Sequence, residues 1–171
     1  MPRRALLMSI RPNYAAQIFD GTKTVELRRV RPRLTSGDLV LVYASSPVKA
    51  LLGAFEVSRV IAAAPSKLWK RTGRKARTTR EQFDDYFNGA ALGYGIVLKR
   101  TWLLTKPMGL AKLRERHSSF RPPQSYHYLT DKQAKRIGLL RVLGNGSSNG
   151  HRNGVNNGKL DRRGQRRATR T

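Results

Sequence analysis

The stretch Gly21-Thr22-Lys23-Thr24-Val25-Glu26-Leu27-Arg28-Arg29 places one carboxylate among three cations within nine residues. Its glycine follows Phe19-Asp20, a position where glycine commonly ends a helix. From Val25 onward, apolar and polar residues nearly alternate, and this pattern predicts a half-exposed strand. Side chains on a strand alternate between its two faces, so Glu26 and Arg28 share one face, which we expect to line a cleft.

Lys23 is three residues from Glu26, so on a regular strand the two side chains lie on opposite faces. A direct ion pair between them therefore requires that residues 21–24 form a loop instead of a strand. Two interpretations of Glu26 stay open at this point. It either orients cations that contact a ligand, or it forms a structural ion pair that fixes the strand to the rest of the fold.

The segments around this stretch predict a single α+β domain. Apolar runs predict further strands at residues 5–10, 39–44, 50–61 and 91–104. Helical patterns occur at residues 12–20, 65–72, 78–89, 110–116 and 130–143, with a basic loop at 74–77. Strands and helices do not alternate regularly, which argues against a doubly wound parallel sheet. We therefore predict a small mixed β-barrel with peripheral helices over residues 1–143.

The composition changes at Gly144, after which Gly, Asn, Ser and Arg dominate. Such a segment buries too little apolar surface to fold, so we predict a disordered basic tail over residues 144–171. The tail has seven basic residues and one acid, for a net charge of +6 out of the +25 of the whole chain, and this leaves +19 on residues 1–143. A charge of this size indicates a polyanionic partner, and nucleic acid is favoured over a membrane surface.

Other kinds of site have little support in the composition. The chain has no cysteine, which excludes disulfides and thiolate metal sites, and its three histidines are scattered. We predict neither a metal nor a cofactor. No apolar run approaches the roughly 20 residues of a membrane span, and the short N-terminal run does not have the length of a signal peptide. We expect a cytoplasmic protein that does not contact membranes, and we assume a monomer.

The pattern Gly21-x-Lys23-x-x-Glu26-x-Arg28 resembles the G-x-K-x-x-E-x-R signature of the ASCH domain, a member of the PUA-like superfamily. The surroundings agree, because a strand and a short helix precede the signature and Gly37-Asp38 leads into an apolar strand. The resemblance extends over about residues 4 to 140. It implies a PUA-like β-barrel with a polar cleft, and it implies RNA as a partner ahead of DNA or a free nucleoside.

The residues that we expect at a nucleic-acid site are Lys23, Glu26, Arg28, Arg29, Arg31, Arg33, Tyr94, Gln124, Ser125 and Tyr126. The signature residues would line the cleft, the three following arginines would contact phosphates, and the tyrosines would stack on bases. The Gln-Ser pair would lie at the rim. Less specific interpretations stay open, namely a solvated strand edge for the arginines and core packing for the tyrosines.

We predict an RNA-binding or modified-nucleoside-binding module, acting in RNA processing, translation or transcriptional regulation. The alternative is a small hydrolase acting on RNA or on a modified nucleobase, with Lys23 as activating cation and Glu26 as general base. One family branch hydrolyses acylated cytidine with a threonine nucleophile at the position of Glu26, and this chain departs from that pattern. A free Glu26 in an open pocket favours the enzyme, whereas a Glu26 held by cations favours binding or structure.

Overall fold

The chain folds as one mixed α+β unit, and the computed structural model describes residues 4–145 and 147–150. The strands are β1 (Ala5–Ile10), β2 (Val25–Arg28), β3 (Leu39–Ala44), β4 (Ala50–Ala63), β5 (Gly93–Gly109), β6 (Tyr126–Leu129) and β7 (Ser147–Gly150). The helices are α1 (Pro12–Phe19), α2 (Pro65–Ala76), α3 (Arg80–Phe87), α4 (Leu110–Arg116), α5 (Asp131–Arg136) and α6 (Leu139–Asn145). No helix in this part of the chain has the length and apolar content needed to cross a membrane.

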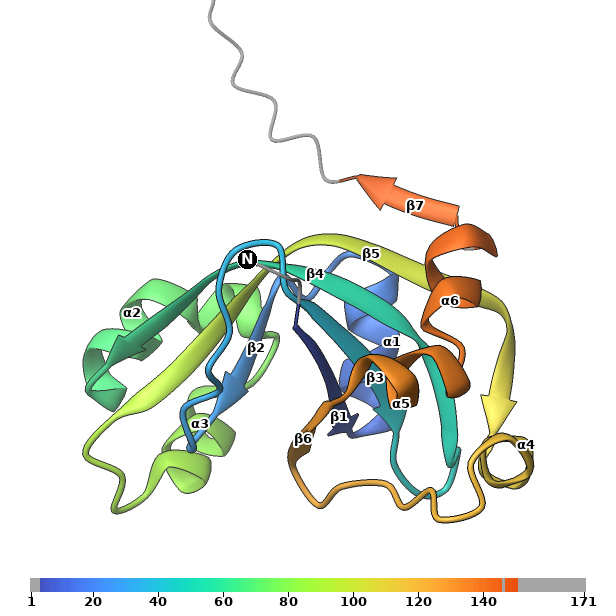
Figure 1. The fold of residues 1–171 in the computed structure, drawn as a ribbon. Coiled ribbons are helices and arrows are strands. Elements are labelled where there is room, and N and C mark those ends of the chain that lie inside the picture. The colour runs from blue at the N-terminus through green and yellow to red at the C-terminus, as the bar shows by residue number, and fades with distance from the viewer. Residues whose placement is uncertain (1–3, 146, 151–171) are drawn as a thin grey trace, which may run out of the picture.

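The strands form one curled sheet with the order β2-β5-β4-β3-β1-β6, and β7 pairs with β5 away from this path. The β1–β3 pair is parallel, and the other strand pairs are antiparallel. Figure 1 shows the long strands β4 and β5 arching over the molecule, with β2 on one side and β1 and β6 on the other. The path ends at β2 and β6, so the predicted barrel is a half-barrel that stays open between these strands.

The core lies on both faces of the sheet, which explains the continuous apolar sequence of β1. Leu6 and Met8 pack on one face together with Ile18 of α1, and Leu7 packs on the other face. The α2–α3 pair has its own small cluster around Leu68. Gly21 has a φ of 84°, a left-handed conformation that suits glycine, and this confirms the predicted end of α1 just before the signature.

Several predicted boundaries differ from the observed ones. The predicted basic loop at 74–77 is mostly helix, because α2 continues to Ala76 with Arg74 and Lys75 in its last turn, where cations complement the helix dipole. The capping box of α3 begins at Thr79, one residue later than predicted, and its partner is Gln82. The last predicted helix is split at Gly138, which has a φ of 96°.

The strand predicted to end near residue 104 continues as β5 to Gly109, beyond Pro107. The ladder to β4 skips residues 104–107 and resumes at the pairs Leu51–Met108 and Ala50–Gly109. Proline has no backbone N–H to donate, so an irregular part of the ladder accommodates it.

Two elements lie at or beyond the predicted boundary at residue 143. Helix α6 continues to Asn145, and β7 pairs with residues 100–103 of β5. Strand β2 covers only residues 94–97 of β5, so residues 100–103 keep an open edge with unpaired N–H and C=O groups, to which β7 pairs. The rest of the predicted disordered tail, residue 146 and residues 151–171, lies outside the described residues.

A buried carboxylate on β4 gives the fold a predictable pH response. Glu56 is 2% exposed, and it accepts hydrogen bonds from Lys99 at 2.9 Å and from Arg100. Burial alone would raise the pKa of Glu56, but the hydrogen bonds and charges of Lys99 and Arg100 outweigh it and lower the pKa. Above the ordinary pKa of 4.5, both the folded and the unfolded state are ionised and the stabilisation by Glu56 is complete.

As the pH falls below 4.5, the unfolded state binds a proton at Glu56 first, so this part of the stability is lost with acid. We expect Glu56→Gln to flatten the decrease in unfolding free energy between about pH 5 and pH 3, as measured by urea denaturation at several pH values. Glu115→Gln is the control, because the Glu115 side chain is 61% exposed. If the unfolding free energy of Glu56→Gln decreased with acid as steeply as that of the wild type, Glu56 would not be the source of this pH dependence.

Candidate functional site

A cavity of about 660 Å³ opens between β2 and the end of β1, on the open side of the half-barrel. Its walls come from β1, α1, β2, α3 and the loops after β3 and before β6. The lining residues are Ser9, Ile10, Arg11, Tyr14, Lys23, Glu26, Leu27, Arg28, Ser45, Thr78, Gln82, Phe83, Asp85, Tyr86 and Gln124. The volume is within the range of sites that accept small ligands.

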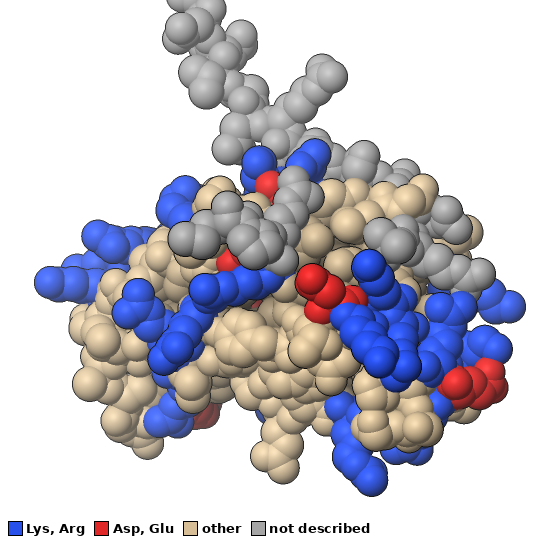
Figure 2. All heavy atoms as spheres, viewed as in Figure 1, with Lys and Arg blue, Asp and Glu red and all other residues tan. Residues whose placement is uncertain are grey.

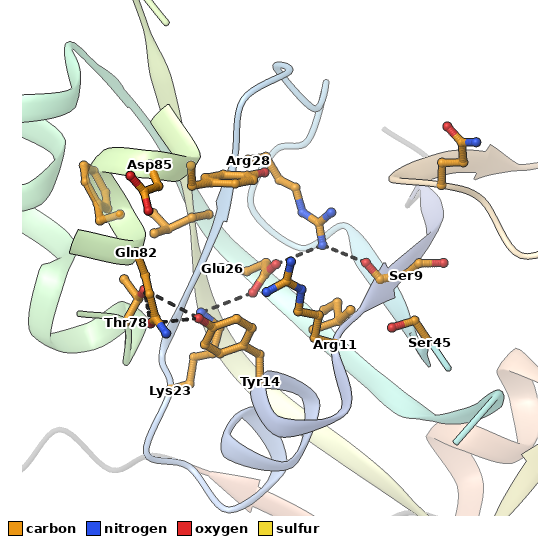
Figure 3. Close-up of a pocket in the computed structure, with 15 residues that line it drawn as sticks. Ser9, Arg11, Tyr14, Lys23, Glu26, Arg28, Ser45, Thr78, Gln82 and Asp85 are labelled. Atoms are coloured by element: carbon orange, nitrogen blue, oxygen red, sulfur yellow. Dashed lines mark hydrogen bonds and ion pairs between the residues drawn. The ribbon is translucent and has the colours of Figure 1, made fainter. Parts of the chain in front are cut away.

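Glu26 is the centre of a buried ion-pair network at one wall of this cavity. Its Oε1 accepts a hydrogen bond from Arg28 Nη2 at 2.9 Å, and its Oε2 lies 3.3 Å from Lys23 Nζ. Figure 3 shows the carboxylate between the two cations. All three residues are less than 10% exposed. Both oxygens of Glu26 are therefore engaged, which corresponds to the ion-pair interpretation of this residue.

The Lys23–Glu26 pair exists because residues 21–24 form a loop. Strand β2 begins only at Val25. Before it, the backbone N–H of Lys23 donates to Gln17 O, and that of Thr24 donates to Lys75 O. The alternation that would separate the two side chains therefore does not extend to Lys23, and the condition stated for a direct pair is met.

Lys23 is enclosed on several sides. Its Nζ donates to the carbonyl of Ala76 at the end of α2, at 2.7 Å, and lies 4.9 Å from the centre of the Tyr14 ring. Burial lowers the pKa of Lys23, and the neighbouring carboxylate of Glu26 opposes this shift. The Lys23 side chain and the backbone bond from Thr24 N to Lys75 O together tie the end of α2 to the signature.

Arg28 connects the two open sides of the half-barrel. Its Nη2 donates to Ser9 O in β1 at 3.1 Å, and its Nη1 donates to Ser125 Oγ, just before β6, at 3.4 Å. Arg28 itself belongs to β2, the opposite end of the sheet path. A guanidinium thus spans the gap that backbone pairing leaves open, since its donors point in several directions at once.

Part of the predicted site lies in this cavity and part lies outside it. Lys23, Glu26, Arg28 and Gln124 line it, and Ser125 reaches it only through its contact with Arg28. Arg29 is exposed and donates to Asn88 O, and Arg31 and Arg33 are exposed on the loop that follows β2. Tyr94 is half-buried on β5 beside Arg28, and it does not line the cavity.

Tyr126 has a contact that the sequence did not predict. Its hydroxyl donates to Arg31 O at 3.0 Å, and the neighbouring Tyr128 hydroxyl accepts from Arg33 N at 2.6 Å. The two tyrosines therefore hold the backbone of the arginine loop, which leaves the side chains of Arg31 and Arg33 in solvent. Burial, together with the nearby Tyr128, raises the pKa of Tyr126.

Most of the remaining wall was not predicted as a site. Arg11 and Tyr14 flank Pro12 at the start of α1, and Asp85 and Tyr86 lie on α3. Arg11 and Tyr14 come shortly before the signature, whereas Asp85 and Tyr86 are far from it in sequence, and the patterns of both segments indicate only amphipathic helices. The exposure of Tyr86, next to buried Phe87, is visible only in the structure, so no signal in the sequence marked this wall.

The chain belongs to the ASCH domain family, because the model of that family matches residues 8–114. It is 31% identical over 135 residues to a protein of Zymomonas mobilis named "ASCH domain-containing ribonuclease", which covers 79% of this chain and 90% of the relative. The family and the PUA-like α+β fold predicted from the sequence are thus confirmed.

Solved structures show the same fold. The crystal structure of ASCH from Zymomonas mobilis superposes with a TM-score of 0.74 at 30% identity, covering 80% of this chain and 94% of the other. Human THYN1, in a crystal structure with 5-methylcytosine containing DNA, has a TM-score of 0.53 at 13% identity, covering 81% of this chain and 97% of the other. At that identity the second similarity concerns the fold alone.

Proposed function

We propose that this protein binds RNA and that its cavity takes up an unstacked base of the bound strand. The observation that carries this proposal is the open cavity beside the signature, lined by three cations, two carboxylates and the rings of Tyr14 and Tyr86. Sequence-specific RNA recognition mostly targets bases that are splayed out of a strand, stacked on aromatic rings and bonded along their edges.

The buried network supplies rigid charge, and the exposed side chains of the cavity supply contacts. Both oxygens of Glu26 already accept from cations, so this residue positions Lys23 and Arg28. Arg11, Gln82 and Asp85 are exposed and present donors and acceptors at the cavity mouth. Tyr86 is 41% exposed and offers a ring face on which a base can stack.

A stripe of cations on α2 gives this cavity a neighbouring surface for phosphates. Lys67, Lys70, Arg71 and Arg74 have the spacing i, i+3, i+4, i+7, so they share one helix face. All four are exposed, and no acidic residue lies in α2. Figure 2 shows blue side chains at the left edge, where Figure 1 places α2.

The α2 stripe is directly linked to the cavity. The carbonyl of Ala76, the last residue of α2, accepts from Lys23, and Thr78 lines the cavity two residues further on. A strand whose base enters the cavity therefore has a cationic path along α2. Arg29, Arg31 and Arg33 form a second exposed basic segment after β2. Such contacts to phosphate give affinity without reading sequence.

The comparisons support RNA over DNA as the polymer. The relative that is 31% identical is named as a ribonuclease, whereas the DNA complex belongs to a protein similar in fold alone. The name of the relative also favours a second candidate function, the cleavage of RNA. In the hydrolase predicted as the alternative from the sequence, Lys23 and Glu26 would carry the chemistry, with Glu26 as general base.

The geometry of Glu26 favours binding over that form of catalysis. A general base must reach the proton that it removes, and Glu26 is buried with each carboxylate oxygen already engaged with a cation. An assay of RNA cleavage with Glu26→Gln separates the two functions. Turnover by the wild type that is lost in a folded Glu26→Gln variant would establish the enzyme.

Tyr86→Ala is expected to lower the affinity for a single-stranded RNA by about 5-fold to 150-fold, the effect of removing one stacked base. Fluorescence anisotropy with a labelled RNA, measured at several salt concentrations, gives the dissociation constant. Tyr86→Phe keeps the ring and should bind as the wild type does. Leu92→Ala is a matched control, because Leu92 is 48% exposed and lies outside the cavity.

Equal RNA affinity in the wild type, Tyr86→Ala and Arg11→Ala would show that the cavity takes no part in binding. A DNA of the same sequence is measured in parallel. Tighter binding of DNA than of RNA would overturn the choice of polymer and leave the cavity in place.

A further inference from the structure

A second cavity, of about 240 Å³, lies on the other side of β6. Its lining residues are His117, Ser119, Phe120, Arg121, His127, Leu129, Gln133 and Ile137. The titratable or charged side chains among them are the two histidines and Arg121. This cavity is smaller than most sites for whole ligands, so it suits a phosphodiester and its sugar more than a complete nucleotide.

The side chains of β6 alternate between its two faces. Tyr126 and Tyr128 point to one face, where their hydroxyls hold the loop after β2. His127 lies between them and therefore points to the opposite face, toward the second cavity. The backbone of His127 is fixed by the pairing of β6 with β1, opposite Leu7. No described residue forms a hydrogen bond with its ring, and burial lowers its pKa, which keeps the imidazole neutral at pH 7.

His117 is held in place at the end of α4. Its N–H donates to Leu113 O at 2.9 Å, and its carbonyl accepts from Phe120 N at 2.8 Å. The ring Nδ1 lies 3.0 Å from Ser119 Oγ, which fixes the orientation of the imidazole. The other ring nitrogen has no hydrogen-bond partner among the described residues and is available to a ligand in the cavity.

The same cavity has groups for an anion. Arg121 is exposed and lines it, and a guanidinium matches the geometry of phosphate oxygens. The Oε1 of Gln133 accepts from Thr130 N at 2.9 Å, which leaves the NH₂ of the amide as a donor. Two imidazoles, a guanidinium and an amide thus surround one small cavity walled by Leu129 and Ile137.

We propose that this second cavity cleaves RNA by transfer of the phosphodiester to the neighbouring 2′-hydroxyl, with His127 as general base, His117 as general acid and Arg121 bound to the phosphate. The proposal rests on the proposed function in taking RNA as the bound polymer. It places the chemistry outside the ASCH signature. Glu26, the carboxylate of the signature, has both oxygens paired with cations.

The reaction balances without a cofactor. The 2′-oxygen bonds to phosphorus and its proton passes to His127, while the bond from phosphorus to the 5′-oxygen breaks and His117 gives its proton to that oxygen. The products are a 2′,3′-cyclic phosphate and a 5′-hydroxyl. In a second step, water attacks phosphorus and gives its proton to His117, and His127 returns its proton to the 2′-oxygen, which yields a 3′-phosphate.

The test uses the full chain and two substrates, a labelled single-stranded RNA and cytidine 2′,3′-cyclic phosphate. We expect the wild type to form cyclic phosphate and 5′-hydroxyl ends, identified by mass spectrometry. His117→Ala and His127→Ala should each slow cleavage at least 100-fold, since general acid and base catalysis contribute factors of about 10² to 10⁴. The RNA affinity of both variants, measured by anisotropy, should stay unchanged.

Further readouts separate catalysis from folding and from binding. The wild-type rate should have a bell-shaped pH dependence, and each single-histidine variant should lose one limb of it. An RNA with a 2′-deoxy group at the cleaved position should bind and stay intact. The double variant His117→Ala, His127→Ala, prepared in the same way, controls for a contaminating nuclease.

Cleavage by the double variant at the wild-type rate would overturn the proposal. So would a wild type that binds RNA and leaves both substrates intact, and in that case RNA binding by the first cavity would still hold. Turnover of the cyclic phosphate without RNA binding would instead overturn the first cavity as the binding site and support the second as a catalytic one.

Discussion

Glu26→Gln is expected to lower the free energy of unfolding by about 3–5 kcal/mol, the usual cost of leaving buried charges without their partner. Lys23 and Arg28 are 3% and 8% exposed, so neither cation can return to water in the folded state. Urea denaturation followed by circular dichroism measures the change, with the midpoint and the slope determined separately.

The loss of unfolding free energy in Glu26→Gln should become smaller as the pH rises. Burial already lowers the pKa of Lys23, and removal of the Glu26 charge removes the group that opposes this shift. Over the range between the folded pKa and the ordinary 10.5, the unfolded state binds the proton more tightly, so stability increases with pH. When the Lys23 amine loses its proton in the variant, no unpaired charge is left at that position.

Glu56→Gln is the matched control for this prediction. Glu56 is as buried as Glu26, but its partners Lys99 and Arg100 have side chains that are 53% and 46% exposed. These cations regain water when the carboxylate is removed, so the expected loss is only about 1–2 kcal/mol. Equal losses in Glu26→Gln and Glu56→Gln would show that the burial of the partner cations does not set the cost.

Removal of the α2 stripe, by alanine at Lys67, Lys70, Arg71 and Arg74, is expected to weaken RNA binding by about 100-fold to 1,000-fold near 0.1 M salt. Each phosphate contact with single-stranded nucleic acid contributes about 0.7 to the slope of log affinity against log salt concentration. The slope should therefore decrease by about 3, and this change is measured by anisotropy over a salt series.

The fold should tolerate this change. Like charges at i, i+4 on a helix destabilise it by a few tenths of a kcal/mol per pair, so the variant is expected to be as stable as the wild type or slightly more stable. A second variant, with Arg71→Lys and Arg74→Lys, keeps the charge and should retain most of the affinity. An unchanged salt slope in the alanine variant would exclude α2 as a phosphate-binding surface.

Sequence patterns predicted the parts of the site that are local. The glycine that ends α1, the signature strand and the shared face of Glu26 and Arg28 follow from neighbouring residues, and the structure contains them, although the strand predicted to be half-exposed is mostly buried. The start of α3 shifted by a residue or two, because Thr78 and Thr79 offer nearly the same capping pattern and only Thr79 caps the helix. Helix α2 continues four residues beyond its predicted end at residue 72.

The unpredicted parts of the site come from α1, which directly precedes the signature in the chain, and from α3, which is distant from it. Arg11, Asp85 and Tyr86 line the cavity because α1 and α3 converge on it. Their own segments show only helical periodicity. Tyr126 was predicted to stack on a base, and the structure shows that its hydroxyl and that of Tyr128 hold the loop of Arg31 and Arg33. Such contacts depend on which strand becomes the edge of the sheet.

The sequence by itself determined the ASCH family, the α+β class, the strongly basic charge and the three signature residues, because these depend on composition and on short-range spacing. The tertiary structure decided that both oxygens of Glu26 are paired, that Arg28 spans the open half-barrel to Ser9 and Ser125, and that His117 and His127 share one cavity. The physical reason is that the curl of the sheet brings strands together that are distant in the chain. The side-chain partners across the half-barrel therefore depend on how far the sheet curls, and the alternation along a single strand does not predict them.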